Sequence, residues 1–262
     1  MLDIAKYEAR QRARGTGALL VIVSLYLFLL VWMFPSIEAS GAAFESYAES
    51  LPDALQGAFA IESITTIGGF LAAEIYQFIW ILMLGLYLTY LGGGLIAADV
   101  ESGRIDTLLA APVSRVRIVV EKYCSLLVPI LAVNLLMPVV VLLAVRSIGE
   151  SLPVSDVVAL HILSIPYLLV AAGIGLFLSV FFDRADIPQR AGLGVLFGLF
   201  TLETVTYDTD IEWIGALSPT RYYDPAAIIV DGEYDLAGAL VLLAAAMALV
   251  IASAEWFRRR DV

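Results

Sequence analysis

The chain has 262 residues, of which 61% are hydrophobic and 16% are charged, and its formal net charge is −11. A soluble domain contains about 45–50% apolar and about 25% charged residues, so this composition excludes an ordinary soluble protein and predicts an all-α integral membrane protein that crosses the bilayer several times. A single cysteine, Cys124, and the strong negative charge also exclude a disulfide scaffold and a nucleic-acid binder.

The amino-terminal residues predict an amphipathic helix. Lys6, Arg10 and Arg14 follow one another at four-residue spacing, whereas Leu2 and Ile4 lie near another side of the same helix. We expect an elbow helix on the inner membrane surface that leads into the first span. A basic tail that only enforces topology is the alternative.

Uncharged runs predict six membrane spans, because a helix needs about 20 residues to cross the hydrocarbon core. The expected spans are residues 16–36, 75–98, 118–145, 157–182, 190–207 and 236–256. Four of them contain charge-free runs of 23 to 26 residues, whereas only 12 uncharged residues precede Glu203 in the fifth. Together they form a single transmembrane domain, residues 1–262.

The basic residues predict the orientation of the chain. If the amino terminus is cytoplasmic, 13 of the 15 Lys and Arg residues lie inside, and only Arg146 and Arg221 lie outside. Because Lys and Arg in short loops mark the cytoplasmic side, we expect a multi-pass protein of the cell membrane with both termini inside. In the outer segments, residues 38–74 and 208–235, nearly all charged residues are acidic. These segments also contain apolar stretches too short to span, for which interfacial helices and a shallow hairpin are the two alternatives.

The predicted inner loop, residues 99–117, carries the clearest pattern. A helix over residues 100–110 would place Ile105, Leu108 and Leu109 on one side and Glu101, Arg104 and Asp106 elsewhere. Pro112 would end this helix, since the residue before a proline is biased away from helical conformation. An amphipathic helix on an inner loop suits docking against a cytoplasmic partner, and a turn that is amphipathic by chance is the alternative.

This loop resembles the inner-loop signature of the permeases of type-2 ATP-binding-cassette (ABC) exporters. That signature has an acidic residue, a glycine, two leucines, Pro-Val-Ser-Arg and a downstream lysine. The matching residues are Glu101, Gly103, Leu108, Leu109, Pro112, Val113, Ser114, Arg115 and Lys122. In the family the loop is the coupling helix, which sits in a groove of a separate ATPase subunit. A second acidic residue often stands near the first, and here Asp99 precedes Glu101 with Val100 between them, so the role of Asp99 stays open.

The resemblance implies a non-catalytic membrane subunit whose coupling helix binds the ATPase. The residues expected to make that contact are Glu101, Gly103, Arg104, Ile105, Asp106, Leu108, Leu109, Pro112 and Arg115. The expected partners are two copies of the ABC ATPase subunit, a second copy of this permease or a related one, and membrane lipid, with no nucleic acid. The cargo is expected from the spans themselves to be amphiphilic or lipid-like, because they contain few ionisable residues, and no substrate-binding residue can be assigned. A channel or ion-coupled carrier that needs no nucleotide, and a membrane anchor that transmits ATPase force to an outer partner, are the alternatives.

The chain lacks the residues for its own ATP or metal chemistry. A phosphate-binding loop requires G-x-x-x-x-G-K-[ST], and neither Lys6 nor Lys122 follows a glycine. ATP and Mg are therefore expected only in the partner ATPase. One histidine, His161, and one cysteine, Cys124, cannot assemble a metal site of several His and Cys ligands, so neither a catalytic site nor a metal site is predicted.

Polar and small residues within the spans have mainly structural interpretations. We expect Asn134 to hydrogen-bond between helices, Glu203 to face water, a partner or the outer interface, and His161 to be an interfacial or helix-packing residue. Glycines such as Gly92 and Gly175 would permit close helix packing. Lipid phosphates are alternative ligands for the inner cations Arg115 and Lys122.

The choice of charged residues is also unusual. The 26 acidic residues are 13 Asp and 13 Glu, whereas the 15 basic ones are 13 Arg and two Lys. This composition resembles that of proteins from halophiles. On that interpretation the acidity reflects solvation and says little about ligands.

Overall fold

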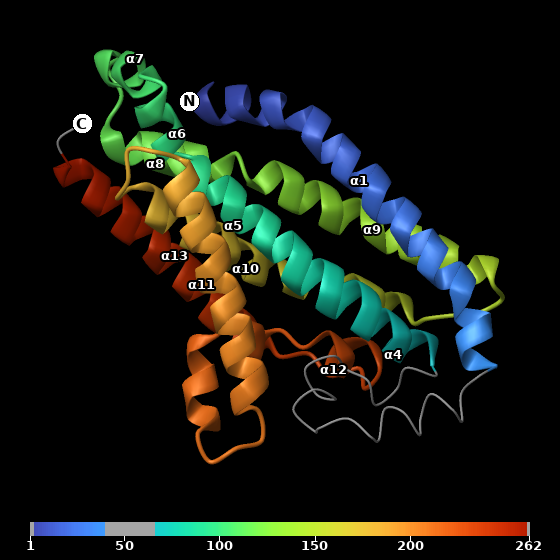
Figure 1. Cartoon of the computed structure of the whole chain (residues 1–262). Helices are drawn as coiled ribbons and strands as arrows, with labels where there is room; N and C mark the ends of the chain where they lie inside the picture. The colour runs from blue at the N-terminus through green and yellow to red at the C-terminus, as the bar shows by residue number, and fades with distance from the viewer. Residues whose placement is uncertain (1–2, 40–65, 261–262) are drawn as a thin grey trace.

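The computed structural model describes residues 3–39 and 66–260, and every regular element in those residues is helical (Figure 1). The first half contains α1 (Asp3–Glu38), α4 (Ile67–Leu71), the π-helix η2 (Ala72–Leu84), α5 (Gly85–Gly94), α6 (Ala97–Glu101), α7 (Arg104–Ala110), α8 (Arg115–Cys124) and α9 (Leu127–Ser147). The second half contains α10 (Val154–Ser179), α11 (Asp186–Thr206), the 3₁₀ helices η3 (Glu212–Leu217) and η4 (Pro219–Tyr222), α12 (Pro225–Ile229) and α13 (Leu236–Arg259). The expected all-α architecture is confirmed for this part of the chain.

Five helical stretches of the described chain are long and apolar enough to cross a membrane. They are Ile4–Glu38, Ile67–Glu101, Arg115–Ser147, Val154–Ser179 and Leu236–Arg259. The helix of the fifth expected span, α11, has 21 residues but includes Asp186, Arg190 and Glu203, and it is not among the five. Six spans therefore stay a prediction, although α11 runs between the same two ends of the bundle as its neighbours (Figure 1).

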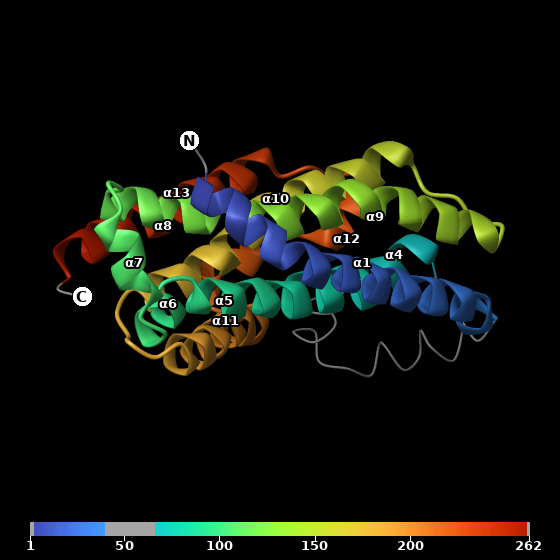
Figure 2. The ribbon, with the colours of Figure 1, turned by 90° about the horizontal axis from the view of Figure 1, so that it is seen from above.

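The helices define two ends of the molecule. The first turns of α1, the α6–α7 segment, the turn between α10 and α11, and the last turn of α13 gather at one end, which we call the α7 end (Figures 1 and 2). The elements α4, η3, η4 and α12 lie at the opposite end, the α12 end (Figure 1). The elements expected inside thus lie together, and the side of the membrane that they face stays a prediction.

Two helices begin more than two turns ahead of the boundaries drawn on the sequence. The amino-terminal basic segment and the first expected span form one continuous helix, α1, whose first turns curve away from the rest (Figure 1), and the elbow on the membrane surface stays a prediction. The second long helix begins at Ile67, ahead of Glu74, and so absorbs most of the apolar stretch 63–73. The apolar stretch 54–61 lies outside the described residues.

Glycines allow α5 and α10 to pack with their backbones in contact. A Cβ on Gly175 would lie 2.0 Å from the Thr89 carbonyl oxygen, and a Cβ on Gly92 would lie 2.3 Å from the Ala172 carbonyl oxygen. The Thr89 hydroxyl lies 2.9 Å from the carbonyl oxygens of Gly85 on its own helix and Ala171 on α10. The packing role expected for these glycines is confirmed.

Polar side chains in the core are joined across helices. The Ser164 hydroxyl on α10 donates to Asn134 Oδ1 on α9 at 2.7 Å, and Trp80 Nε1 on η2 donates to Ser164 Oγ at 3.2 Å. The expected interhelical role of Asn134 is thus confirmed. His161 is fully buried, with its ring edge-on to those of Tyr76 and Trp80. The helix-packing interpretation of His161 is therefore confirmed, and its depth relative to the membrane interface stays a prediction.

Candidate functional site

The predicted coupling segment is built from two short helices. We expected one helix over residues 100–110, but α6 ends at Glu101 and α7 begins at Arg104. The break lies at Gly103, whose φ of +70° is a left-handed conformation that side chains with a Cβ rarely adopt. A Cβ at Gly103 would have no neighbour within 4 Å, so the glycine serves the bend and not a close contact.

The faces of α7 follow the predicted amphipathic pattern. Ile105 is only 2% exposed and belongs to the core, whereas Leu108 and Leu109 are half-buried against it. Asp106 is exposed on the other side. The helix ends at Ala110, and Ala111 is extended immediately before Pro112, so the predicted stop is confirmed.

A buried lysine holds the base of this segment. Lys122 on α8 is 2% exposed, and its Nζ lies 2.8 Å from Glu8 Oε1 on α1 and 2.5 Å from Asp99 Oδ2 on α6. Asp99 Oδ1 also binds Arg104 Nη2 at 2.7 Å, at the start of α7. A buried ammonium needs such paired carboxylates because desolvation of an unpaired charge is costly. Lys122 therefore joins α1, α6 and α8, and the alternative that it contacts lipid phosphates is wrong.

A second buried carboxylate binds the start of α1. Glu121 Oε2 on α8 accepts hydrogen bonds from the backbone N–H groups of Ile4 at 3.0 Å and Ala5 at 3.4 Å. Its other oxygen accepts from Arg117 Nε at 2.6 Å. The first N–H groups of a helix have no intrahelical partner and carry partial positive charge, so a carboxylate there is favourable. Glu121 thus fixes the first turn of α1 to α8.

The start of the coupling segment also contacts the turn that precedes α11. Glu101 Oε2 accepts a hydrogen bond of 2.9 Å from the backbone N–H of Ala185, which is the N-cap residue of α11. Close packing supports this contact, because a Cβ on Gly93 of α5 would lie 2.9 Å from Cα of Gln189 on α11. Helix α5 and the first turns of α11 are therefore in direct backbone contact.

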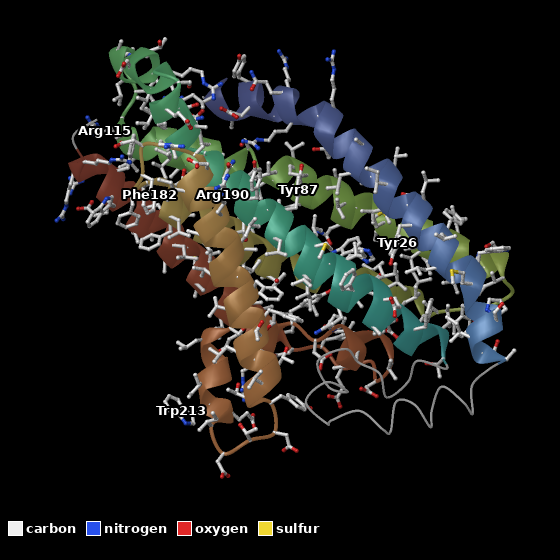
Figure 3. All side chains as sticks on the ribbon, viewed as in Figure 1. Tyr26, Tyr87, Arg115, Phe182, Arg190 and Trp213 are labelled. Atoms are coloured by element: carbon white, nitrogen blue, oxygen red, sulfur yellow. The ribbon has the colours of Figure 1, made fainter. Side chains whose placement is uncertain are left out.

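The end of the coupling segment is held by the last turn of α13. Arg115 Nη1 donates to the carbonyl oxygens of Phe257, at 3.4 Å, and Arg260, and its guanidinium lies 5.7 Å from the centre of the Phe257 ring. A cation is favourable at the unpaired carbonyls of a helix C-terminus. Arg260 in turn donates to the Val180 carbonyl at 2.7 Å and pairs with Asp183. Arg115 and Phe182 accordingly lie at the same end of the molecule (Figure 3).

The structure separates the predicted contact residues by exposure. Five of the nine are exposed at the α7 end: Glu101, Gly103, Arg104, Asp106 and Pro112. Leu108 and Leu109 are half-buried, Ile105 is inside the chain's own core, and Arg115 faces α13. Among the described residues, no group of three or more His, Cys, Asp and Glu side chains could hold a metal ion.

Glu8 and Glu121 were missed because their roles depend on helix packing. Their charged side chains stand beside other charges in the sequence, and nothing in the local spacing shows which carboxylate meets which cation. One signal was available for Lys122, since it is one of only two lysines and it immediately precedes a long apolar run. That position favours a buried, paired role at the end of a span.

The α12 end contains a separate polar pocket. It has a volume of about 280 Å³, and its lining includes Gln77, Glu203, Tyr207, Glu212, Arg221 and Tyr223. Arg221 Nη1 lies 3.8 Å from Glu203 Oε1 and donates to the Glu212 carbonyl at 2.7 Å. Burial raises the pKa of Tyr223 well above its usual value, so this residue remains a neutral donor to the Leu160 carbonyl oxygen. Glu203 thus lines a pocket away from the α7 end, and its contact with water, a partner or the outer interface stays a prediction.

Comparison with known proteins identifies one family. A family model described as "ABC-2 family transporter protein" matches residues 2–262. No curated protein matches the chain at a significant level. The match covers both the coupling segment and the pocket at the α12 end.

Proposed function

Because the chain belongs to the ABC-2 family of transporter proteins, we propose that it is the membrane-spanning half of an ATP-driven exporter that draws energy from a separate ATPase subunit. Family membership makes it a transmembrane subunit of an ABC transporter, of a kind that is generally not catalytic, in the cell membrane. The proposal adds the direction of transport, the partner and the cargo.

One observation carries this proposal: the α6–α7 segment protrudes from the bundle (Figure 1) while its base is held by contacts to several helices. Lys122 and Asp99 link it to α1 and α8, Glu101 links it to α11, and Arg115 links its end to α13. A segment that only connected two spans would not need these contacts. This arrangement is suited to receive force on an exposed tip and to deliver it to several helices at once.

The exposed tip has the composition of a protein contact. The partly exposed side chains of Leu108 and Leu109 form an apolar centre, and the exposed Arg104 and Asp106 provide charges beside it. Interfaces combine such an apolar centre with a polar rim that fixes orientation. Ile105 is buried, so we assign it the role of holding α7 on the core and remove it from the proposed contact residues.

The partners and cargo follow from the same assignment. We propose two ATPase copies, which would bind ATP and Mg, beneath a pair of permeases made of two copies of this chain or of this chain and a related one. The chain's α7 end would then face the cytoplasm. The long helices contain few ionisable side chains, which favours an amphiphilic or lipid-like cargo over an ion-coupled carrier, because carriers place such groups along their pathway.

Leu108→Asp tests the proposed contact. The chain is co-expressed with a candidate ABC ATPase, namely the product of the adjacent coding sequence if that product carries a Walker-type phosphate-binding loop, and both co-purification and ATPase stimulation in vesicles are measured. An apolar hot spot replaced by a charge weakens binding by about tenfold or more. Val116→Asp is the control, since Val116 is an exposed apolar residue on α8, beyond Pro112.

Four results would contradict parts of the proposal. Undiminished binding and stimulation in Leu108→Asp, or equal losses in Val116→Asp, would exclude α7 as the contact. Cargo movement in vesicles without any nucleotide would favour a channel or carrier. A stable ATPase complex that moves no amphiphile in a flux assay would favour an anchor that transmits force to an outer partner.

A further inference from the structure

A long groove follows α13 on the side where it packs against α10. Two pockets, of about 630 and 500 Å³, share the lining residues Phe177 and Ala252, so they are neighbouring parts of one groove. The first lies at the α7 end, and the second continues toward the α12 end, where Pro219 and Tyr222 of η4 line it. Neither pocket includes any residue of the coupling segment or of the polar pocket around Glu203.

The part of the groove at the α7 end combines aromatic and basic side chains. The rings of Phe177 and Phe181 are 5.0 Å apart, and Phe181 lies 4.6 Å from the ring of Trp256. Arg259 and Arg260 complete the lining with one acidic residue, Glu255. Basic side chains beside an aromatic wall at the end of a membrane helix are what an anionic headgroup requires.

Some of these donors have capacity for a ligand. The Arg259 side chain is 74% exposed, and it pairs with Glu255 through Nε at 2.7 Å and through Nη2. A guanidinium has five N–H groups, so this pair leaves donors for an anion. The indole N–H of Trp256 has no hydrogen-bond partner within residues 3–39 and 66–260, and half of that side chain is exposed. Arg260 is mostly occupied by the carbonyl of Val180 and by Asp183 and contributes mainly charge.

The rest of the groove is a narrow apolar lane. Small side chains on one side of α13, Ala245, Ala248 and Ala252, leave space that Ile174 and Leu249 line with apolar surface. From Val241 to Ala252 the lane follows 11 helical steps, or about 16 Å at 1.5 Å per residue. One leaflet of the hydrocarbon core is about 15 Å thick, half of the bilayer core. The lane thus has the length of an acyl chain within one leaflet.

We propose that this groove binds one anionic phospholipid, with its phosphate at Arg259 and Trp256 and an acyl chain along the alanines of α13. The exposed guanidinium of Arg259 supports this occupant, because its pairing with Glu255 leaves N–H donors for a negative headgroup, whereas Arg260 is already paired with Asp183. The inference does not depend on ATPase coupling or on the direction of transport, so failure of either proposal leaves the other testable.

Lipid retention measured by native mass spectrometry tests the site. The full-length chain is reconstituted in vesicles of equal parts phosphatidylglycerol and phosphatidylcholine, extracted in mild detergent, and the lipids retained per chain are counted. We expect one phosphatidylglycerol to be retained in preference to phosphatidylcholine. Arg259→Gln should reduce that retention about fivefold, the value of one basic residue near an anionic headgroup. Arg258→Gln is the matched control, because Arg258 also pairs with Glu255 but lines neither pocket.

A second pair of variants tests the acyl lane. Ala248→Leu should fill the lane and reduce retention of both lipids, whereas Ala244→Leu should not, since Ala244 is exposed on α13 and lines neither pocket. Circular dichroism confirms that each variant is folded. Inorganic phosphate added during extraction should not displace the lipid.

Four outcomes would overturn the proposal. They are equal losses in Arg258→Gln and Arg259→Gln, no preference for phosphatidylglycerol, displacement by inorganic phosphate alone, or, in the same native mass spectra, loss of a chain dimer in Ala248→Leu without loss of lipid. The last would identify the groove as a contact between two copies of this chain.

Discussion

The buried lysine at the base of the coupling segment gives a sharp test of the structure. Methionine is close to lysine in volume and has no charge, so Lys122→Met removes the cation with little change in packing. Removing one partner of a buried ion pair costs about 3–5 kcal/mol, because the other charge stays buried without compensation. In this variant Asp99 would still pair with Arg104 at 2.7 Å, and Glu8 would still pair with Arg12 at 3.3 Å. We therefore expect a loss at the lower end of this range, about 3 kcal/mol.

Reversible unfolding in mixed micelles of rising sodium dodecyl sulfate content measures this loss. Lys6→Met is the control, because Lys6 is the only other lysine and is exposed, and it should change the free energy of unfolding by less than about 0.5 kcal/mol. Adding Glu8→Gln and Asp99→Asn to Lys122→Met should recover about 1 kcal/mol or more, since neutral groups are cheaper to bury. A loss below about 1 kcal/mol, the range of exposed pairs, would refute the buried-pair interpretation. So would a triple variant less stable than Lys122→Met.

Three further substitutions test other parts of the fold. Gly175→Ala should lower the free energy of unfolding by more than about 2 kcal/mol, because its Cβ would lie 2.0 Å from the Thr89 carbonyl oxygen. Gly194→Ala is the control: its Cβ would meet nothing within 4 Å, so it should be neutral or slightly stabilising in the same titration. Gly103→Ala should cost about 1–2 kcal/mol through its left-handed φ alone, and Gly103→Asn should cost less, so equal losses would contradict backbone strain as the cause. Arg115→Gln should speed amide hydrogen exchange in the last turn of α13 while leaving the middle of that helix protected, and unchanged exchange would show that Arg115 does not hold this turn.

Patterns that depend on neighbouring residues could be predicted from the sequence. The stop before Pro112 follows from a steric clash within two residues, and the long helices follow from uninterrupted apolar runs. The inner-loop signature could be recognised in the sequence, since its leucines, Pro112 and Arg115 all lie within 15 residues, and its coupling role stays a proposal. The burial of Ile105 could not be read from this pattern, because an amphipathic face shows which side is apolar and not whether the chain itself or a partner covers it.

Contacts between distant residues could not be predicted in the same way. Lys122 and Glu8 are 114 positions apart, and the sequence offers several acidic residues at the same expected membrane depth. The choice among them depends on how α1 lies against α8, which is set by side-chain packing along both helices. The break at Gly103 could not be predicted from the sequence either, because glycine permits a bend without requiring one.

Under the coupling role proposed above, the contacts at the α7 end would give force on this segment a route to the pocket around Glu203. The hydrogen bond from Ala185 to Glu101 contributes about 0.5–1.5 kcal/mol and can be exchanged for water at an exposed site, so it is too weak to drive a helix by itself. The contact of Gly93 with Gln189 is different, because two backbones in van der Waals contact cannot move toward each other without displacing one helix. We therefore expect a displacement of α5 and α6 to push α11 at this contact. With 21 residues, or about 31 Å, α11 would carry the displacement to its last turn, where Glu203 faces Arg221.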